Sequence, residues 1–505
     1  MCGEGGGQNS KLIRLLPNVI FESENRTVNL AQKSIRGGVA TLTSQGIQLI
    51  LTVVGTSVLA RLLTPTDYGL IGMVIVVVGF ADMFKDAGLS MATIQRQTIS
   101  HKQISTLFWF NLLISAFIGL CILALSPLVA KFYGHLELTA VTAVLSLSFI
   151  AGGLSIQHQA LLRRHMSFTA LAIVQIVAQL VGLVVSLLCA FHDLRYWSLV
   201  IGTLVRGFVT TLLTFYFCPW VPGAPEKDTA VFDMLRFGSH LTGFNFVNYF
   251  ARNADNILIG KFIGVNALGL YSRAYQLFLM PLNQIRAPLN QVTMPVLSAL
   301  HDQPERYAQY YTRMIDVLAS IAMPLTIYCA IEADFLIRVF LGSQWLGAVP
   351  VFRILAIAGL LQTVTSTSGM VLVTSGFSSR YFWYGTISAI ITVISFTVGL
   401  PFGIEGVAAA YTIVNYVVLI PSLFFCFHRT PVTVGLFMKT MLRPLVITSI
   451  ATTGILSLKL LWIDDSLVAH CLYAISFFSI YVGLFICQQS VREQARFFVK
   501  ELFTI

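Results

Sequence analysis

Long apolar segments dominate this sequence, and each is about as long as a helix that crosses a membrane. Such a helix needs roughly 20 predominantly apolar residues, and fourteen windows of this kind recur along the 505 residues. They cover 38–60, 68–93, 104–130, 136–158, 168–190, 196–217, 235–260, 267–298, 313–340, 349–375, 381–400, 404–427, 438–458 and 467–489. The pattern predicts an all-α polytopic membrane protein with about 14 transmembrane helices.

Composition narrows the function classes in the same direction. Charged residues make up 11% of the chain, less than half of the roughly 25% that is typical of soluble domains. A soluble enzyme, a DNA-binding protein and a disordered scaffold are therefore excluded. The net charge of +10 indicates membrane orientation rather than nucleic-acid binding, because cytoplasmic loops of membrane proteins carry an excess of Lys and Arg.

The distribution of basic residues predicts that orientation. With a cytoplasmic N-terminus, twenty of the 32 Lys and Arg residues fall on the cytoplasmic side and six in loops on the opposite side. This bias predicts a multi-pass protein of the bacterial cytoplasmic (inner) membrane with both termini in the cytoplasm. The remaining six basic residues fall within predicted spans.

A weak internal repeat indicates a duplicated architecture. The segment Arg61–Leu70 is weakly similar to Lys261–Leu270. The offset of 200 residues between them also aligns Arg36 with Arg236. Six spans separate the copies, so both enter the membrane in the same direction, as in parallel transporter repeats. The expected parts are a cytoplasmic basic tail (1–36), a six-helix N-lobe (37–220), a cytoplasmic linker (221–234), a six-helix C-lobe (235–430), two extra helices (431–490) and a cytoplasmic tail (491–505). The stretch 313–340 can also form one span and a short re-entrant piece that ends near Gly342.

Three segments resemble the polysaccharide transporter family of the MOP (multidrug/oligosaccharidyl-lipid/polysaccharide) exporter superfamily. They are RLLTPTDYGL (61–70), DAGLSMATIQ (86–95) and PLVAKFYG (127–134). The likeness is greatest to Wzx-type lipid-linked oligosaccharide flippases of the colanic-acid-exporter-like branch. It implies that an undecaprenyl-pyrophosphate-linked repeat unit is moved across the membrane by alternating access, for capsule, exopolysaccharide or O-antigen synthesis. The partners so implied are the lipid-linked substrate, membrane lipids and a glycan polymerase or export machinery, while the glycan and the oligomeric state stay open.

Two other functions stay open beside the flippase. One is an ion-coupled drug or metabolite antiporter of the same superfamily, and the other is a membrane-embedded glycosyltransferase or ligase. The enzymatic alternative is disfavoured because the sequence has no large periplasmic loop, no H-E-x-x-H pair and no P-loop before Lys261. The eight scattered cysteines suit buried apolar thiols. We therefore expect no catalytic residue, no metal and no cofactor, with coupling to H⁺ or Na⁺.

Basic residues inside spans are the main candidates for substrate binding. An Arg or Lys at the centre of a membrane helix costs roughly 2.5–3.5 kcal/mol on insertion scales, so it is expected to face a protein-lined or aqueous interior. A pyrophosphate is a fitting ligand, since guanidinium and ammonium groups bind phosphate oxygens. The candidates are Arg206, Arg286, Arg252, Arg273, Arg353 and Lys85. Local pairing is the alternative for two of them, Lys85 with Asp82 or Asp86 and Arg252 with Asp255.

Polar and proline residues in two spans complete the predicted site. Prolines recur every seven residues in the stretch 267–298, which predicts a bent or broken helix. The hinge candidates are Pro281, Pro288 and Pro295, and the sugar-facing amide candidates are Asn283, Asn290, Asn245 and Asn248. A kinked but purely structural helix and lipid-facing aromatic residues are the alternatives. Asp255 is the candidate for the coupling ion, or else part of a structural salt bridge with Arg252.

Overall fold

The computed structural model describes residues 30–86, 89–96, 99–225, 249–250, 252–461 and 466–487. Within these ranges the regular structure is helical and contains no strand. In this part of the chain eleven helical stretches are long and apolar enough to cross a membrane, and several of them, such as Ser378–Phe427, contain more than one helix. The all-α polytopic fold is confirmed, while the number fourteen stays a prediction.

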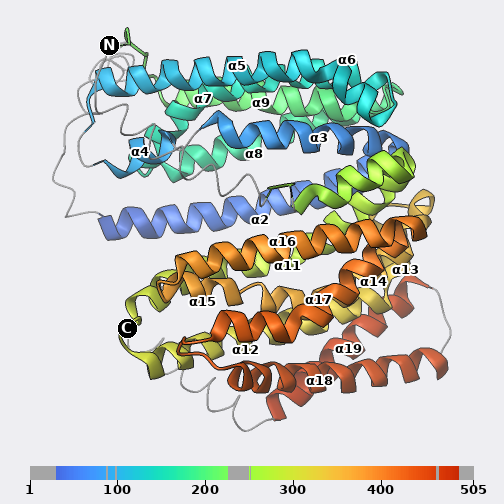
Figure 1. Cartoon of the computed structure of the whole chain (residues 1–505). Helices are drawn as coiled ribbons and strands as arrows, with labels where there is room; N and C mark the ends of the chain where they lie inside the picture. The colour runs from blue at the N-terminus through green and yellow to red at the C-terminus, as the bar shows by residue number, and fades with distance from the viewer. Residues whose placement is uncertain are drawn as a thin grey trace, which may run out of the picture. The chain divides into compact units, whose positions relative to one another are not determined.

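Contacts divide the chain into two compact units, Met1–Gly269 and Leu270–Ile505. The described helices of the first unit (Figure 1) are α2 (Leu30–Leu62), α3 (Pro65–Lys85), α4 (Leu89–Gln95), α5 (His101–Tyr133), α6 (Glu137–Leu145), α7 (Leu147–Arg164), α8 (Phe168–Phe191) and α9 (Trp197–Phe217). Helical residues 252–258 and the π-helix η1 (Ile259–Ile263) follow. The linker predicted at 221–234 lies mostly outside the described residues.

The second unit begins within α11 (Val265–Ala299). It continues with α12 (Pro304–Ile331), α13 (Ala333–Phe340), η2 (Ser343–Ala348), α14 (Val349–Thr365), α15 (Ser368–Thr374), α16 (Ser378–Gly399), η3 (Leu400–Phe402), α17 (Gly403–Phe427), α18 (Val434–Leu461) and α19 (Leu467–Cys487). The stretch 313–340 is a long helix followed by a separate short one, as the second of its two predicted forms requires.

A buried carboxylate fixes the turn between α2 and α3. Asp67 Oδ2 accepts hydrogen bonds from the backbone N–H of Thr64 at 2.9 Å and from its hydroxyl at 2.7 Å. Together with the bond from Asp67 N–H to the Thr64 hydroxyl this forms a capping box, which satisfies donors at the helix start. Asp67 Oδ1 also accepts from the N–H of Tyr196, just before α9, at 3.2 Å. One side chain thus joins three helix ends.

The predicted repeat has a counterpart in the structure. The helices α3 and α11 begin at Pro65 and Val265, 200 residues apart. A Cβ atom added to Gly69 would lie 1.9 Å from the carbonyl oxygen of Val265, and one added to Gly269 would lie 1.8 Å from that of Pro65. Each copy therefore brings its glycine against the backbone that opens the other copy's helix, an approach that only glycine allows.

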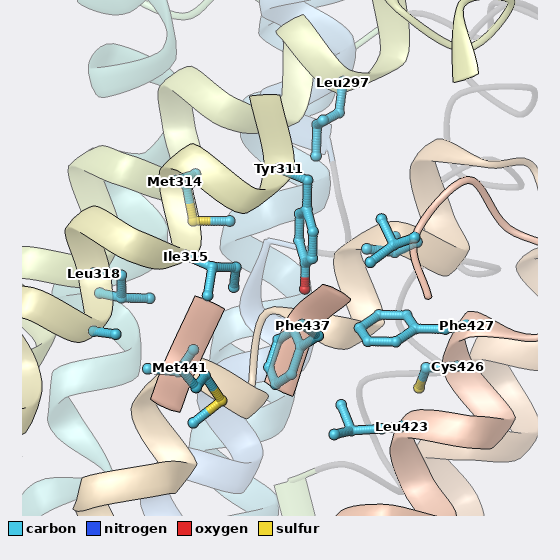
Figure 2. Packing of buried hydrophobic residues seen from close by; sticks show 14 of the residues in the cluster. Leu297, Tyr311, Met314, Ile315, Leu318, Leu423, Cys426, Phe427, Phe437 and Met441 are labelled. Carbon is cyan, nitrogen blue, oxygen red and sulfur yellow. The ribbon is translucent and has the colours of Figure 1, made fainter. Parts of the chain in front are cut away.

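The last two helices belong to the second unit. Figure 2 shows buried side chains of α11, α12, α17 and α18 in one cluster, among them Tyr311, Met314, Phe427, Phe437 and Met441. A second cluster joins α12, α18 and α19. Since lipid is as apolar as these side chains, van der Waals contact and hydrogen bonds hold the helices together rather than the hydrophobic effect.

Candidate functional site

The predicted span 349–375 is broken in two within the described chain. Helix α14 ends at Thr365, and α15 begins at Ser368. Hydroxyl groups bond back onto the helix at this point: Ser366 donates to the carbonyl of Thr363 at 2.9 Å, and Thr367 to that of Val364 at 2.7 Å. Such bonds compete with the helical ladder. In transporters, discontinuous membrane helices supply backbone groups to substrate and ion sites.

The predicted cation Arg286 lies at this break. Its Nη1 donates to the hydroxyl of Ser366 at 3.2 Å. Ser366 is exposed and Arg286 is half-buried, so the pair borders open space in this unit rather than the packed core. An arginine, an exposed hydroxyl and a helix break therefore meet at one point, which we name the α14–α15 break site.

Two buried tyrosines fix the short helix α15 on α12. The hydroxyl of Tyr311 lies 3.1 Å from that of Thr367, and the hydroxyl of Tyr307 lies 2.5 Å from that of Thr374. Both tyrosine side chains are fully buried. Because these bonds anchor both ends of α15, they hold the backbone of the break site in place.

Helix α11 carries all three predicted hinge prolines, Pro281, Pro288 and Pro295, and remains one continuous helix. Of the two predicted forms, the broken helix is not observed, while a bend at the prolines stays a prediction. The nearby interruption lies between α14 and α15. Asn290, one turn after Arg286, has a buried Oδ1 atom without a hydrogen-bond partner in the described chain. Asn283 is exposed.

The first unit contains a polar patch that was not predicted from the sequence. On α8, Gln179 Nε2 donates to the hydroxyl of Thr52 at 2.9 Å and to the carbonyl of Gln48 at 3.1 Å, both on α2. Gln48 Nε2 in turn donates to Gln175 Oε1 at 3.1 Å. We name Gln48, Thr52, Gln175 and Gln179 the amide patch. The spacing i, i+4 on each helix is a signal that could have found it, because it places both pairs on one helix face.

Arg206 lies beside the helix that carries the amide patch. A Cβ atom on Gly182 would lie 2.8 Å from Arg206 Cβ and 2.9 Å from the carbonyl oxygen of Gly202, so α8 and α9 pack backbone to backbone. Gly182 follows Gln179 by three residues, about one helical turn. The Arg206 side chain is exposed and has no ion pair within the described residues. That Arg206 and Arg286 face one cavity stays a prediction.

The other predicted cations do not gather at one point. Lys85 Nζ lies 3.1 Å from Asp82 Oδ1, so the expected local pairing is confirmed. Arg353 Nε donates to the carbonyl of Ala330 at 3.3 Å, which ties α14 to α12. Arg273 is half-buried and Arg252 is exposed. A substrate role for these residues stays a prediction.

Asp255, the predicted coupling carboxylate, is 3% exposed. Its Oδ1 accepts a hydrogen bond from the N–H of Asn256 at 2.8 Å. The alternative role of Asp255, a structural salt bridge with Arg252, also stays a prediction. Asn245 and Asn248, the other predicted sugar-facing amides, lie outside the described residues.

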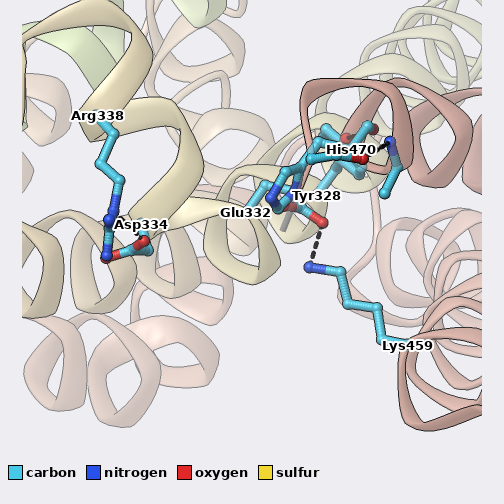
Figure 3. Close-up of polar contacts among 8 residues, drawn as sticks. Tyr328, Glu332, Asp334, Arg338, Lys459 and His470 are labelled. Carbon is cyan, nitrogen blue, oxygen red and sulfur yellow. Dashed lines mark hydrogen bonds and ion pairs between the residues drawn. The ribbon is translucent and has the colours of Figure 1, made fainter. Parts of the chain in front are cut away.

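A buried ionic cluster in the second unit was also missed. Glu332 lies between α12 and α13, and Figure 3 shows its carboxylate between Lys459 of α18 and His470 of α19. Glu332 Oε2 lies 2.7 Å from His470 Nδ1. The ring of His470 stacks on Phe335 with centroids 4.0 Å apart. Because Glu332 is far in sequence from both of its partners, 138 residues from His470, no local pattern indicates the cluster.

In the described part of the chain, no group of three or more His, Cys, Asp or Glu side chains is arranged to hold a metal ion. The cysteines there are free thiols. Beyond the end of α9, burial raises the pKa of the Cys218 thiol to about 11. Since the thiolate is the reactive form, this cysteine stays protonated and inert at neutral pH.

Comparison with known proteins identifies the family. The profile of the family described as "Polysaccharide biosynthesis protein" matches residues 58–350. The chain is 25% identical to the lipopolysaccharide biosynthesis protein WzxC of Escherichia coli K12, over 79% of this chain and 81% of that protein. It is 26% identical to the teichuronic acid biosynthesis protein TuaB of Bacillus subtilis 168, over 81% of this chain and 85% of that protein.

Solved structures show the same fold at lower identity. The lipid II flippase MurJ in an inward closed conformation matches with a TM-score of 0.71 and 14% identity, over 93% of this chain and 100% of that chain. An inward-facing MATE transporter of the MOP superfamily matches with a TM-score of 0.60. These similarities show that the chain shares this fold. Because the family profile matches more than half of the 505 residues, the chain belongs to the polysaccharide biosynthesis protein family.

Proposed function

We propose that this protein is a flippase, which moves a lipid-linked oligosaccharide across the cytoplasmic membrane by alternating access. The observation that carries the proposal is the fold shared over nearly its whole length with a lipid II flippase. The relatives support it: WzxC and TuaB are named for the biosynthesis of surface polysaccharides, and ExoT of Rhizobium meliloti is named a succinoglycan biosynthesis transport protein.

The polar groups of each unit suit the two parts of such a substrate. Arg206 and Arg286 offer guanidinium groups, which bind phosphate oxygens with two parallel hydrogen bonds. Side-chain amides and hydroxyls carry both donors and acceptors, as sugar hydroxyls require, and these come from the amide patch and the α14–α15 break site. The pyrophosphate would then be held by arginine and the sugars by amides and hydroxyls.

Transport of this kind needs an energy source. The sequence contains no P-loop for ATP, so we propose coupling to a gradient of H⁺ or Na⁺, with Asp255 as the carboxylate that takes the ion. A buried carboxylate favours either protonation or a cation beside it. The nearly complete burial of Asp255 supports this role.

The expected orientation belongs to the same proposal. Both termini lie in the cytoplasm, as the twenty-to-six distribution of basic residues predicts. Alkaline phosphatase fused after Ile505 should be inactive, because the enzyme matures only outside the cytoplasm. An active fusion would contradict the orientation.

A transport assay tests the function directly. The purified protein is reconstituted in vesicles with a fluorescent polyprenyl-pyrophosphate-linked oligosaccharide, and dithionite quenches the label in the outer leaflet. We expect the protein to make the inner-leaflet label accessible, while empty vesicles keep it protected. Gradient-driven efflux of a cationic dye with no movement of the glycan lipid would favour the drug antiporter instead. Formation of a new glycosidic product from labelled donor would favour the transferase.

A further inference from the structure

A groove of about 340 Å³ opens on the first unit between α3, α5 and the side chains of Phe250 and Ile257. Its walls are apolar and aromatic side chains, among them Val76, Phe80, Leu128, Phe132 and Phe250. Burying a sugar or another polar group against such walls would leave its hydrogen bonds unmade, at a cost of several kcal/mol. The groove therefore suits a hydrocarbon chain.

The inner end of this groove is held in a defined shape. The hydroxyl of Tyr249 donates to the carbonyl of Val76 at 2.9 Å, which fixes residues 249–250 on α3. The rings of Phe80 and Phe250 lie with centroids 4.8 Å apart. On the α5 side, Leu128 is 59% exposed and Phe132 is 46% exposed. A chain can thus enter from the side, where a membrane helix meets lipid.

The periplasmic end of the groove, near Phe132, carries positive charge from lysine side chains. Lys261 Nζ donates to the carbonyl oxygen of Phe132 and lies 5.0 Å from the centroid of its ring. The ammonium groups of both Lys261 and Lys131 belong to exposed side chains. Both lysines stand in segments that the charge distribution assigns to the periplasmic surface. An anionic group bound there would sit at the depth of the outer headgroups, with its hydrocarbon chain running inward along the groove.

We propose that this groove binds the polyprenyl chain of the substrate on the side to which the glycan is delivered, with the pyrophosphate at Lys131 and Lys261. The inference rests on the proposed function and adds a binding site for the lipid part of the substrate. Two lysines match the charge of a pyrophosphate better than that of a phospholipid, whose headgroup carries a single phosphate. The groove then retains the flipped lipid while the glycan leaves.

Photo-crosslinking in transport-competent vesicles tests the site. Benzoylphenylalanine replaces Leu128, which lines the groove, or Leu120, which is 64% exposed on the same helix and does not line it. The vesicles contain phosphatidylethanolamine, phosphatidylglycerol and radiolabelled undecaprenyl-pyrophosphate-linked glycan. We expect the label at position 128 and not at 120, with loss of label when unlabelled undecaprenyl pyrophosphate is added.

The lysines give a second readout. Lys261→Ala and Lys131→Ala should each lower labelling at position 128 about fivefold, since one lysine near an anionic headgroup contributes about 1 kcal/mol. Lys439→Ala, an exposed lysine of the second unit, should leave labelling unchanged. In parallel vesicles the phosphatidylglycerol carries the radiolabel instead. Equal labelling at 120 and 128, or crosslinking of phosphatidylglycerol in place of the glycan lipid, would contradict the proposed site. Transport measured in the same vesicles separates the two claims: normal transport without preference for position 128 rejects the groove alone, whereas absent transport rejects the proposed function.

Discussion

Glu332 and Lys459 form an ion pair with 2.5 Å between Oε1 and Nζ, in which the carboxylate side chain is 1% exposed and the lysine side chain 26%. The pair joins the end of α12 to the end of α18. Because His470 binds the second carboxylate oxygen, one buried charge connects both C-terminal helices to the rest of the second unit.

Removal of the lysine should therefore destabilise this unit. Lys459→Met leaves a buried carboxylate without its cation, which costs about 3 kcal/mol or more in other proteins. We expect a clearly lower midpoint of thermal unfolding in detergent, and Lys459→Arg should restore most of it. The matched control is Arg338→Met, whose partner Asp334 lies 2.7 Å away in an exposed pair; such pairs contribute roughly 0–1 kcal/mol. Equal midpoints for Lys459→Met and Arg338→Met would contradict the structural role of the buried pair.

The two repeat-related glycines should respond alike to substitution. In Gly69→Ala and Gly269→Ala the new methyl group meets a backbone carbonyl at under 2 Å, so the helix starts must separate, at roughly 1–3 kcal/mol or more. Folded yield and thermal midpoint should fall in both variants. Gly46→Ala is the control, since no atom lies within 4 Å of its added Cβ. A harmless substitution at either repeat position would show that the close approach is not required.

Arg286 should matter for transport more than for folding. Arg286→Ala removes a charge-assisted contact worth about 1.5–3 kcal/mol, so we expect glycan transport to fall roughly ten- to hundredfold at normal protein abundance. Arg286→Lys should recover part of it, because Lys lacks the planar fork. Arg206→Ala is expected to behave in the same way.

The control for these arginines follows from the structure. Arg380, which the sequence assigns to a cytoplasmic loop, donates to the carbonyls of His428 and Phe425 and so caps α17. It is therefore unsuitable as a neutral site. Arg306, which is exposed and whose bond within the described residues is to nearby Gln303, is the better choice, and Arg306→Ala should transport normally. Normal transport by both Arg286→Ala and Arg206→Ala would reject the arginine-based mechanism while leaving the family unchanged.

The response of the transport rate to an ion gradient distinguishes a coupling role of Asp255 from a purely structural one. Asp255→Asn keeps the shape of the side chain but cannot release a proton or neutralise a cation, so transport should become slow and independent of the H⁺ or Na⁺ gradient. Asp302→Asn changes an exposed carboxylate and should preserve the response. The measurement is transport rate against imposed gradient. An unchanged gradient response in Asp255→Asn would rule out the coupling role.

The apolar windows of the sequence predict where most of the long helices lie. They do not predict the interruptions within some of these helices. The windows 136–158 and 349–375 contain breaks at Ser146 and at Ser366–Thr367. Hydropathy does not mark such breaks, because one or two hydroxyl residues hardly change the average of an apolar window. The hydroxyls nevertheless donate to carbonyls of the preceding helical turn and so compete with its backbone hydrogen bonds. The turn at Thr64–Asp67, in contrast, carries a readable capping box.

The sequence identifies a residue of the candidate site only when that residue is unusual in its position, such as a charge inside an apolar span. Arg286 stands out because a mid-span guanidinium is costly. Its partner Ser366, 80 residues away, has no such mark. The same holds for Glu332 and His470, which are 138 residues apart and meet through helix packing. Pairings of this range are a property of the tertiary fold, which a single sequence does not reveal.

Gly69 lies against Val265 and Gly269 lies against Pro65. This reciprocal pair of contacts resembles the interface of a twofold-symmetric dimer, but both halves belong to one chain. In a symmetric dimer each substitution would change two contacts at once, since both subunits carry it. Here each substitution changes one contact, so the two copies can diverge while the helix crossing is kept. A glycan on a lipid pyrophosphate has no twofold symmetry. In the proposed function, the amides of one copy and the arginine of the other bind the unlike ends of such a molecule.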